Sequence, residues 1–194
     1  LDTPSLLIDM DLVQSNITAM QKKADKYGVA LRPHTKTHKM PELAKLQLAA
    51  GASGITVAKV GEAEVMAATG ISDIFIANQI IGVSKLERIR QLSRHIKIRL
   101  GVDDPAQIDQ LETVFRDESH PVEVLIEIET GENRSGVMQE EQLIRLVKHI
   151  QAQTSVSLKG VFSHEGHTYK AKSSEDCRRL CLDSQNRTLW AAKL

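Results

Sequence analysis

The sequence is poor in aromatic residues and has no long apolar run. Phe, Trp and Tyr make up 3% of its 194 residues, so we expect a core of Leu, Ile, Val and Ala, which is typical of parallel α/β layers. No apolar stretch approaches the roughly 18 residues that cross a bilayer. The N-terminus also lacks the basic and apolar regions of a signal peptide. We therefore expect a cytoplasmic protein without membrane association.

An excess of one charge and a cysteine framework are also missing. The formal net charge is zero, whereas a general nucleic-acid binder carries a basic excess, so no nucleic-acid partner is expected. The two cysteines, Cys177 and Cys181, are four residues apart in a helical pattern. That spacing favours reduced thiols on one helix face over a disulfide framework.

The chain alternates short apolar strands with amphipathic helices. We predict strands over residues 5–9, 29–34, 55–58, 73–77, 95–102, 122–128 and 156–163. Helices are predicted over residues 11–26, with Asp11 as the N-cap, and over 41–50, 60–68, 85–94, 105–115, 140–151 and from 174 onward. Repeated βα units predict a parallel sheet with right-handed crossovers. No Gly-x-Gly-x-x-Gly motif follows the first strand, which disfavours an open dinucleotide-binding sheet.

Polar residues recur just after the predicted strands. They are Lys36, Lys59, Asn78, Gln79, Asp103, Asp104, Glu129, Asn133, Arg134, His164 and His167. An α/β barrel draws its active site from the C-terminal ends of several strands at once, so this recurrence favours a (β/α)8 TIM-type barrel over an open sheet. The six strands from residues 29–34 onward are of the barrel type, whereas a closed barrel needs eight. The barrel would therefore be incomplete in these residues.

The stretch from Leu31 to Lys39 is the most informative one. Strand alternation directs Arg32, His34 and Lys36 to one side. Burying such side chains is costly without an anionic partner, so we expect a site that holds an anion or an electrophile. Neighbouring cations favour the neutral form of the lysine amine, which attacks carbonyl groups. The alternative is a solvated, basic strand end.

Two later stretches carry further candidate residues. In residues 126–137, Arg134 lies between glycines in a turn, where a fixed cation suits a phenolate, carboxylate or phosphate oxygen. In residues 160–169, His164 follows a strand and could stack on a planar cofactor or relay protons. The alternatives are an exposed turn and an ordinary loop histidine. A zinc site built from the histidines at positions 34, 38, 164 and 167 is disfavoured, because their spacing suits zinc only on a helix.

Six segments, in order over essentially the whole chain, also carry a family resemblance. They are Leu1-Asp2-Thr3-Pro4-Ser5-Leu6, Arg32-Pro33-His34-Thr35-Lys36-Thr37-His38-Lys39, Thr56-Val57-Ala58-Lys59-Val60-Gly61-Glu62-Ala63, Ile76-Ala77-Asn78-Gln79, Gly131-Glu132-Asn133-Arg134-Ser135-Gly136-Val137 and His164-Glu165-Gly166-His167-Thr168-Tyr169. Together they resemble the D-threonine aldolase and D-serine dehydratase-like family. The second segment is the most specific.

The resemblance implies a pyridoxal 5'-phosphate enzyme of the alanine racemase fold type. That fold has an N-terminal eight-stranded α/β barrel followed by a β-rich domain, usually in a homodimer. Residues 1–194 would then be a truncated barrel domain that binds pyridoxal phosphate, with the β-rich domain outside them. A divalent metal (Zn or Mn) is also implied, with its ligands outside this chain.

Carried over by position, the resemblance makes Lys36 the Schiff-base lysine. Arg134 would face the phenolic oxygen of the cofactor, and His164 would lie against its pyridine ring. His34 is assigned to the same cofactor pocket from strand alternation. Tyr169 is a further candidate for that pocket, and both Tyr169 and Gln79 are candidates for lining its substrate side.

The implied function is a lyase acting on small D-β-hydroxy amino acids. The residues do not separate an aldolase from a dehydratase. A non-catalytic pyridoxal phosphate carrier and an amino-acid racemase remain the alternatives. We also expect that residues 1–194 alone would not turn over substrate.

Overall fold

The structure, a computed structural model, describes residues 2–194, so Leu1 of the first motif lies outside the described residues. The helices are α1 (Met10–Lys26), α2 (Pro41–Ala49), α3 (Val60–Ala68), α4 (Val83–Ser93), α5 (Pro105–Phe115), α6 (Glu140–Gln151) and α7 (Ser174–Ala191), with a short 3₁₀ helix, η1 (Gly166–Lys170). The strands are β1 (Ile55–Val57), β2 (Asp73–Gln79), β3 (Lys97–Val102), β4 (Val122–Ile128) and β5 (Val156–Ser163). Within residues 2–194, no helix is both long and apolar enough to cross a membrane.

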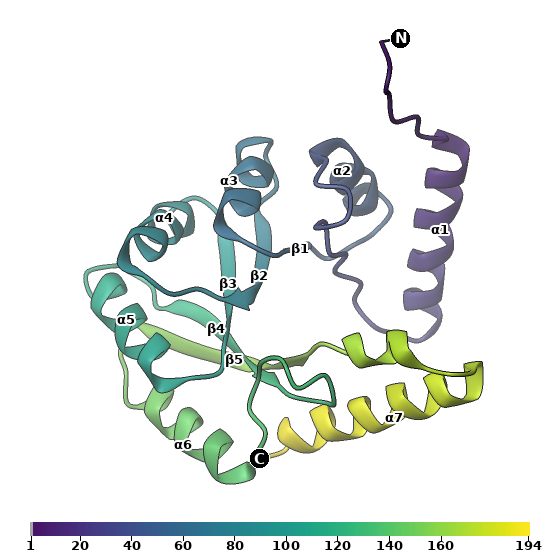
Figure 1. Cartoon of the computed structure of the whole chain (residues 1–194). Helices are drawn as coiled ribbons and strands as arrows, with labels where there is room; N and C mark the ends of the chain where they lie inside the picture. The colour runs from purple at the N-terminus through teal and green to yellow at the C-terminus, as the bar shows by residue number, and fades with distance from the viewer. Residues whose placement is uncertain (1) are drawn as a thin grey trace.

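The five strands form one parallel sheet in the order β1-β2-β3-β4-β5. Strands that follow one another in sequence are neighbours in the sheet, as right-handed βα units require. Helices α2 to α6 lie in an arc around the outer side of the strands (Figure 1). The predicted α/β class and incomplete barrel are therefore confirmed.

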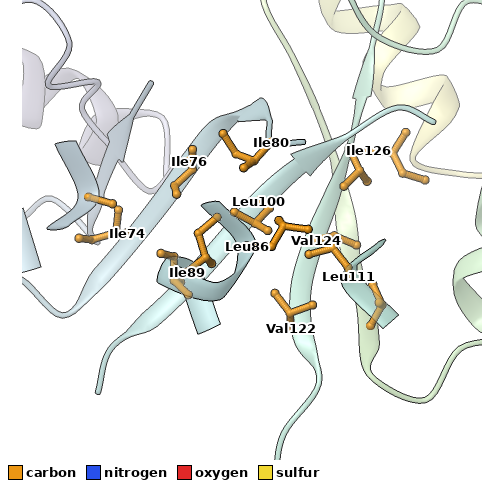
Figure 2. Packing of buried hydrophobic residues seen from close by; sticks show 14 of the residues in the cluster. Ile74, Ile76, Ile80, Leu86, Ile89, Leu100, Leu111, Val122, Val124 and Ile126 are labelled. Atoms are coloured by element: carbon orange, nitrogen blue, oxygen red, sulfur yellow. The ribbon is translucent and has the colours of Figure 1, made fainter. Parts of the chain in front are cut away.

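The apolar core fills the space between the sheet and the outer helices. Figure 2 shows isoleucine, leucine and valine side chains of β2, β3 and β4 packed against α4 and α5. The buried members there include Ile74, Ile76, Leu100, Val124, Ile126, Leu86, Ile89 and Leu111. Burying one such side chain contributes roughly 1.5–3 kcal/mol relative to exposure, so this layer accounts for most of the drive to fold.

The inner side of the sheet is polar. Asp73, Arg99 and Glu123 alternate with the buried core residues of their strands and therefore face away from the outer helices. Arg32 pairs with Asp73 at 2.9 Å, Asp73 with Arg99 at 3.1 Å, Arg99 with Glu123 at 2.8 Å, and Glu123 with Lys159 at 3.5 Å. We call these five residues the charge ladder. Its alternating signs give every carboxylate two cations.

An aromatic pair lies next along the inner side, towards the strand ends. The rings of Phe75 and Phe162 meet edge to face with their centroids 5.0 Å apart. Gly101 lies beneath them, where a Cβ atom would come 2.8 Å from Phe162 Cζ and 3.2 Å from the Asn78 nitrogen. The glycine therefore provides the space into which the ring packs.

Two predicted strands do not form. Residues 29–34 make only an isolated bridge between His34 and Thr56, with the Thr56 N–H donating to the Pro33 carbonyl at 2.8 Å. Pro33 has no N–H to donate, which limits a ladder through this segment. Residues 5–9 are exposed and have no paired strand within the described residues. Within residues 2–194 the sheet therefore has five strands, whereas the sequence predicted six barrel-type strands.

Several local boundaries also differ from prediction, and two of these differences have a clear local cause. Asp9, and not Asp11, is the N-cap of α1, because the Asp9 carboxylate accepts hydrogen bonds from the backbone N–H groups of Asp11 and Leu12. Strand β3 begins at Lys97 and not at His95, because the N–H groups of His95 and Ile96 both donate to the Leu92 carbonyl at the end of α4.

Candidate active site

A cavity of about 550 Å³ lies at the C-terminal ends of the strands. Its lining is His34, Lys36, Thr56, Ala58, Phe75, Ala77, Asn78, Gln79, Glu127, Arg134, Ser135, Phe162, Ser163 and His164. Five of the six predicted site residues are among them: His34, Lys36, Gln79, Arg134 and His164. They come from loops and strand ends that are far apart in sequence, as a barrel active site requires.

Lys36 lies in a tight loop that is anchored by its neighbour. Thr35 is fully buried, and its N–H donates to the Thr56 carbonyl at 2.8 Å. The Lys36 N–H contacts His34 Nδ1 at 3.3 Å, and the Lys39 N–H donates to the Thr35 carbonyl at 2.7 Å. The loop therefore fixes the backbone of Lys36 while its side chain remains exposed.

A second contact ties the same loop to α3. Lys39 adopts a left-handed backbone, with φ of 54°, and its Nζ lies 3.5 Å from Glu62 Oε1. Glu62 is 9% exposed, and its Oε2 accepts the Ala58 N–H at 2.8 Å. A non-glycine residue in the left-handed region is strained, so this pair helps to hold the loop in that shape.

Arg32 does not join the cavity. Its guanidinium belongs to the charge ladder, where it contacts Asp73 Oδ1 at 2.9 Å. The prediction that Arg32, His34 and Lys36 act on one site is therefore wrong for Arg32, because a carboxylate at the opposite end of β2 satisfies its charge.

The surroundings of His34 favour its uncharged form. Burial lowers the pKa of His34, and the positive charge of Lys36 lowers it further, against a smaller opposite effect of Glu62. At neutral pH, His34 therefore contributes an uncharged imidazole beside the Lys36 amine.

The Arg134 loop is held by carboxylates at both ends. Glu129 Oε1 accepts the N–H groups of Gly131 at 2.6 Å and Asn133 at 2.8 Å. Burial opposes ionisation of Glu129, but these backbone hydrogen bonds prevail and lower its pKa. Asp103 Oδ2 accepts the Gly136 N–H at 2.8 Å. Gly136 has φ of +98°, and a Cβ there would come 2.7 Å from the Glu129 nitrogen, so the turn requires glycine.

The guanidinium of Arg134 lies between two further carboxylates. Its Nη2 is 3.8 Å from Glu127 Oε1, and its Nη1 is 3.4 Å from Glu132 Oε2. Glu132 also contacts His164 Nδ1 at 2.7 Å. Because the Arg134 side chain is 52% exposed, both pairs leave part of the guanidinium open to a ligand in the cavity.

The side-chain amide nitrogen of Gln79 donates hydrogen bonds to two carboxylates. Nε2 donates to Glu127 Oε2 and, at 3.1 Å, to Asp103 Oδ2. The reverse orientation would place the amide oxygen against two carboxylates. Oε1 is therefore the atom that Gln79 offers to a ligand, and it would accept a hydrogen bond.

A family model for the alanine racemase N-terminal domain matches residues 8–187. The chain belongs to this family. The match covers the whole sheet, all the predicted site residues and most of α7.

Two curated relatives and one solved structure within this family are especially similar. The chain is 37% identical to D-threonine aldolase of Arthrobacter sp over 93% of its own length and 48% of the relative's. It is 36% identical to D-threo-3-hydroxyaspartate dehydratase of Delftia sp. (strain HT23), again over 93% and 48%. The crystal structure of D-threonine aldolase from Filomicrobium marinum superposes with a TM-score of 0.93 at 33% identity, covering 100% of this chain and 53% of that one.

These similarities confirm the resemblance drawn from the sequence motifs. They also define its extent, since the chain spans about half the length of the curated relatives it matches.

Tyr169 lies apart from the other predicted site residues. It belongs to η1, its side chain is 93% exposed, and it does not line the cavity. Its assignment to the cofactor pocket stays a prediction.

The residues that sequence reasoning missed are mostly acids. Glu127 is 4% exposed, Glu62 is 9% exposed, and both contact the loops that carry Arg134 and Lys36. Glu132 is a third such acid, and Asp103, expected from its place after a strand, contacts Gln79 and the Gly136 N–H. A carboxylate inside an otherwise apolar strand was the available indication for Glu127, because such a charge needs a partner.

The histidines of the disfavoured zinc site have other contacts. His38 Nδ1 accepts the Met40 N–H at 3.0 Å, whereas His167 Nε2 lies 3.5 Å from Ser184 Oγ on α7. In the part of the chain that the structure describes, no group of three or more His, Cys, Asp or Glu residues could hold a metal ion. The expected metal, with ligands outside this chain, stays a prediction.

Proposed function

We propose that this chain is the pyridoxal phosphate-binding barrel portion of a lyase acting on D-β-hydroxy amino acids, with Lys36 as the residue that bonds covalently to the cofactor. One observation carries the proposal. Lys36, Arg134 and His164, from three separate segments, line the same cavity at the strand ends. Enzymes of many chemistries place their sites at this end of an α/β barrel.

The residues fit pyridoxal phosphate by their chemistry. The cofactor carries an aldehyde, a phenolic oxygen and a flat ring. Lys36 supplies an amine for the aldehyde, Arg134 a cation for the phenolic oxygen, and His164 an aromatic face for the ring. The cavity of about 550 Å³ is within the range of cofactor sites. When bound, pyridoxal phosphate draws electrons away from the substrate α-carbon, which weakens the bonds to that atom.

The chain's own residues would hold and move charge around that centre. The Thr35 anchor keeps the Lys36 backbone fixed at the mouth of the cavity, within reach of which its side chain extends. Neutral His34 adds no second positive charge beside it. In a dehydratase, Lys36 Nζ would take the proton from the substrate α-carbon. Arg134 would keep a positive charge at the phenolic oxygen, because guanidinium does not lose its proton in proteins.

The names of the relatives support the substrate class. They are an aldolase for D-threonine and a dehydratase for D-threo-3-hydroxyaspartate, so both act on D-amino acids with a β-hydroxyl group. We extend that class to this chain, and we propose a homodimer for the full-length protein. Because a named aldolase and a named dehydratase match this chain almost equally well, the proposal includes both outcomes.

Covalent labelling tests the proposal. The protein that contains this chain is incubated with pyridoxal phosphate, reduced with borohydride, digested and examined by mass spectrometry. We expect the cofactor mass on Lys36, loss of the label in Lys36→Ala, and no loss in Lys45→Ala, which removes an exposed lysine of α2. A label on another lysine, or none, would refute the proposal. Glycine released from D-threonine would then indicate an aldolase, and pyruvate released from D-serine a dehydratase.

A further inference from the structure

Two hydrogen bonds compete for one ring nitrogen of His164. Nδ1 lies 2.7 Å from Glu132 Oε2, a contact that requires a proton on Nδ1. The Gly166 N–H lies 3.1 Å from the same atom, a contact that requires Nδ1 to be an acceptor. A neutral imidazole nitrogen is either a donor or an acceptor, so only one of the two bonds can be made at a time.

The bond to the carboxylate is the stronger of the two. Hydrogen bonds to an ionised group are shorter and roughly twice as strong as neutral ones, and the 2.7 Å contact has the length of a charge-assisted bond. We infer that Glu132 is a positioning residue that holds His164 as the Nδ1–H tautomer and leaves Nε2 as the unprotonated nitrogen. Nε2 makes no hydrogen bond to any residue in the range 2–194, so no protein contact opposes this assignment.

Gly166, in the loop that follows His164, provides the space for the contact between Glu132 and His164. A Cβ atom on Gly166 would collide with Glu132 Oε1 and lie 2.7 Å from His164 Cε1. The φ of Gly166 does not lie in the left-handed region, so space is what requires glycine here. On the other side, a Cβ atom on Gly131 would lie 3.0 Å from the His167 ring. The loops of Glu132 and His164 therefore fit closely together.

The same carboxylate reaches the second cofactor-facing group. Glu132 Oε2 also lies 3.4 Å from Arg134 Nη1, so one acid orients both the imidazole and the guanidinium. Resting on the proposed function, this means that the pyridine ring would meet an imidazole with a fixed proton position. A ring that switched between tautomers would present a different charge distribution to the cofactor in each state.

Nitrogen NMR of the cofactor-free protein tests the inference directly. The protein is labelled with ¹⁵N-histidine, and His164 is assigned among the seven histidines by its loss in His164→Gln. Spectra are recorded well above pH 6.5, where ordinary histidines are neutral. We expect a protonated Nδ1 in the native protein. In Glu132→Met only the Gly166 N–H remains, so the proton should move to Nε2, and Glu132→Gln should give a mixture.

Glu165→Gln is the matched control. It removes the same charge from a neighbouring residue that contacts Ser163 Oγ and not the imidazole, so the His164 tautomer should not change. Gly166→Ala is the second variant, because it displaces Glu132 without removing its charge and should also raise the Nε2–H population. A native protein with the proton on Nε2, or a tautomer that is the same in all variants, would overturn the inference. The measurement needs no cofactor, so failed labelling of Lys36 would refute the proposed function and leave this result intact.

Discussion

Arg99 lies at the centre of the charge ladder, and its removal tests whether the polar inner side stabilises the fold. Its Nη1 contacts Asp73 Oδ1 at 3.1 Å and its Nε contacts Glu123 Oε2 at 2.8 Å, with 17% of the side chain exposed. Arg99→Met removes both contacts but keeps an unbranched apolar stem of similar length. We expect a lower free energy of unfolding.

The expected loss follows from what remains around each acid. Breaking a fully buried pair costs about 3–5 kcal/mol, because the other charge is left without a partner. Here Asp73 keeps Arg32 at 2.9 Å and Glu123 keeps Lys159 at 3.5 Å. Both acids are also partly exposed, at 29% and 25%, so water replaces some of the lost interaction. We therefore expect a loss of about 2 kcal/mol, less than for a fully buried pair and more than for a surface one.

Urea unfolding followed by circular dichroism measures this loss, and a loss of that size lowers the melting temperature by about 4–8 °C in a domain of this length. Arg88→Met is the matched control, because Arg88 makes a similar forked contact to Glu64 on the surface, where 49% of its side chain is exposed. It should leave the stability nearly unchanged. The loss in Arg99→Lys should lie between those of Arg99→Met and Arg88→Met, because lysine keeps the charge but lacks the planar fork that contacts two acids at once. Equal losses in Arg99→Met and Arg88→Met would refute the reasoning.

Three further predictions concern the cavity and the core. Because the pKa of His34 is lowered from 6.5 in the folded state, the unfolded chain binds more protons just below that value. The free energy of unfolding should therefore fall as the pH drops below about 6.5, and urea titrations of His34→Gln at several pH values should show a flatter dependence. Gly101→Ala places a Cβ 2.8 Å from the Phe162 ring and should lower the stability by about 1–3 kcal/mol, whereas Gly61→Ala meets only Arg88 at 3.9 Å and should not. Leu111→Ala removes a side chain that is 2% exposed, and calorimetry should show a loss of about 2–5 kcal/mol.

Elements with strong local signals were predictable from sequence. Helix α5 begins at Pro105, directly after the Asp104 N-cap, and Gln107 completes a capping box. These three residues act within one turn, so no distant contact is needed to define the start. The predicted range of 105–115 accordingly matches the structure. Strands β4 and β5 were also predicted with their observed bounds, and neither contains Pro.

In residues 29–34, Pro33 was the one local indication against a strand, and the rest of the outcome was not predictable in this way. A strand exists only where a neighbour pairs with it, and that neighbour is chosen by tertiary structure and not by the local apolar pattern. Here the pairing with β1 reduces to the bridge at His34. The segment is extended enough to deliver His34 and Lys36 to the cavity but does not form a ladder.

The gathering of site residues was predictable from a rule about barrels. Residues at the C-terminal ends of parallel strands meet at one end of the sheet, which brings Gln79 and His164 into one cavity, and the extended segment that bridges to β1 delivers His34 and Lys36 to the same end. Tyr169 lies beyond the reach of that rule. It belongs to a short 3₁₀ helix, where strand alternation no longer determines the direction of a side chain.

The acids of β4 could be assigned to one face of the strand from sequence, but their partners could not. In β4, the residues Val122, Val124, Ile126 and Ile128 face the outer helices, so alternation directs Glu123 and Glu127 to the inner side. A strand that reads as apolar on one face and acidic on the other indicates cationic partners within the barrel. Their identity could not be derived, because Arg99 and Arg134 come from a neighbouring strand and a later loop. Yet the requirement for partners could be derived, since burying a carboxylate as deeply as Glu127 is costly without them. The cation that contacts Glu127 is Arg134, which is also the residue proposed to face the cofactor. The acid inside β4 therefore offsets part of the positive charge that Arg134 brings to the cavity.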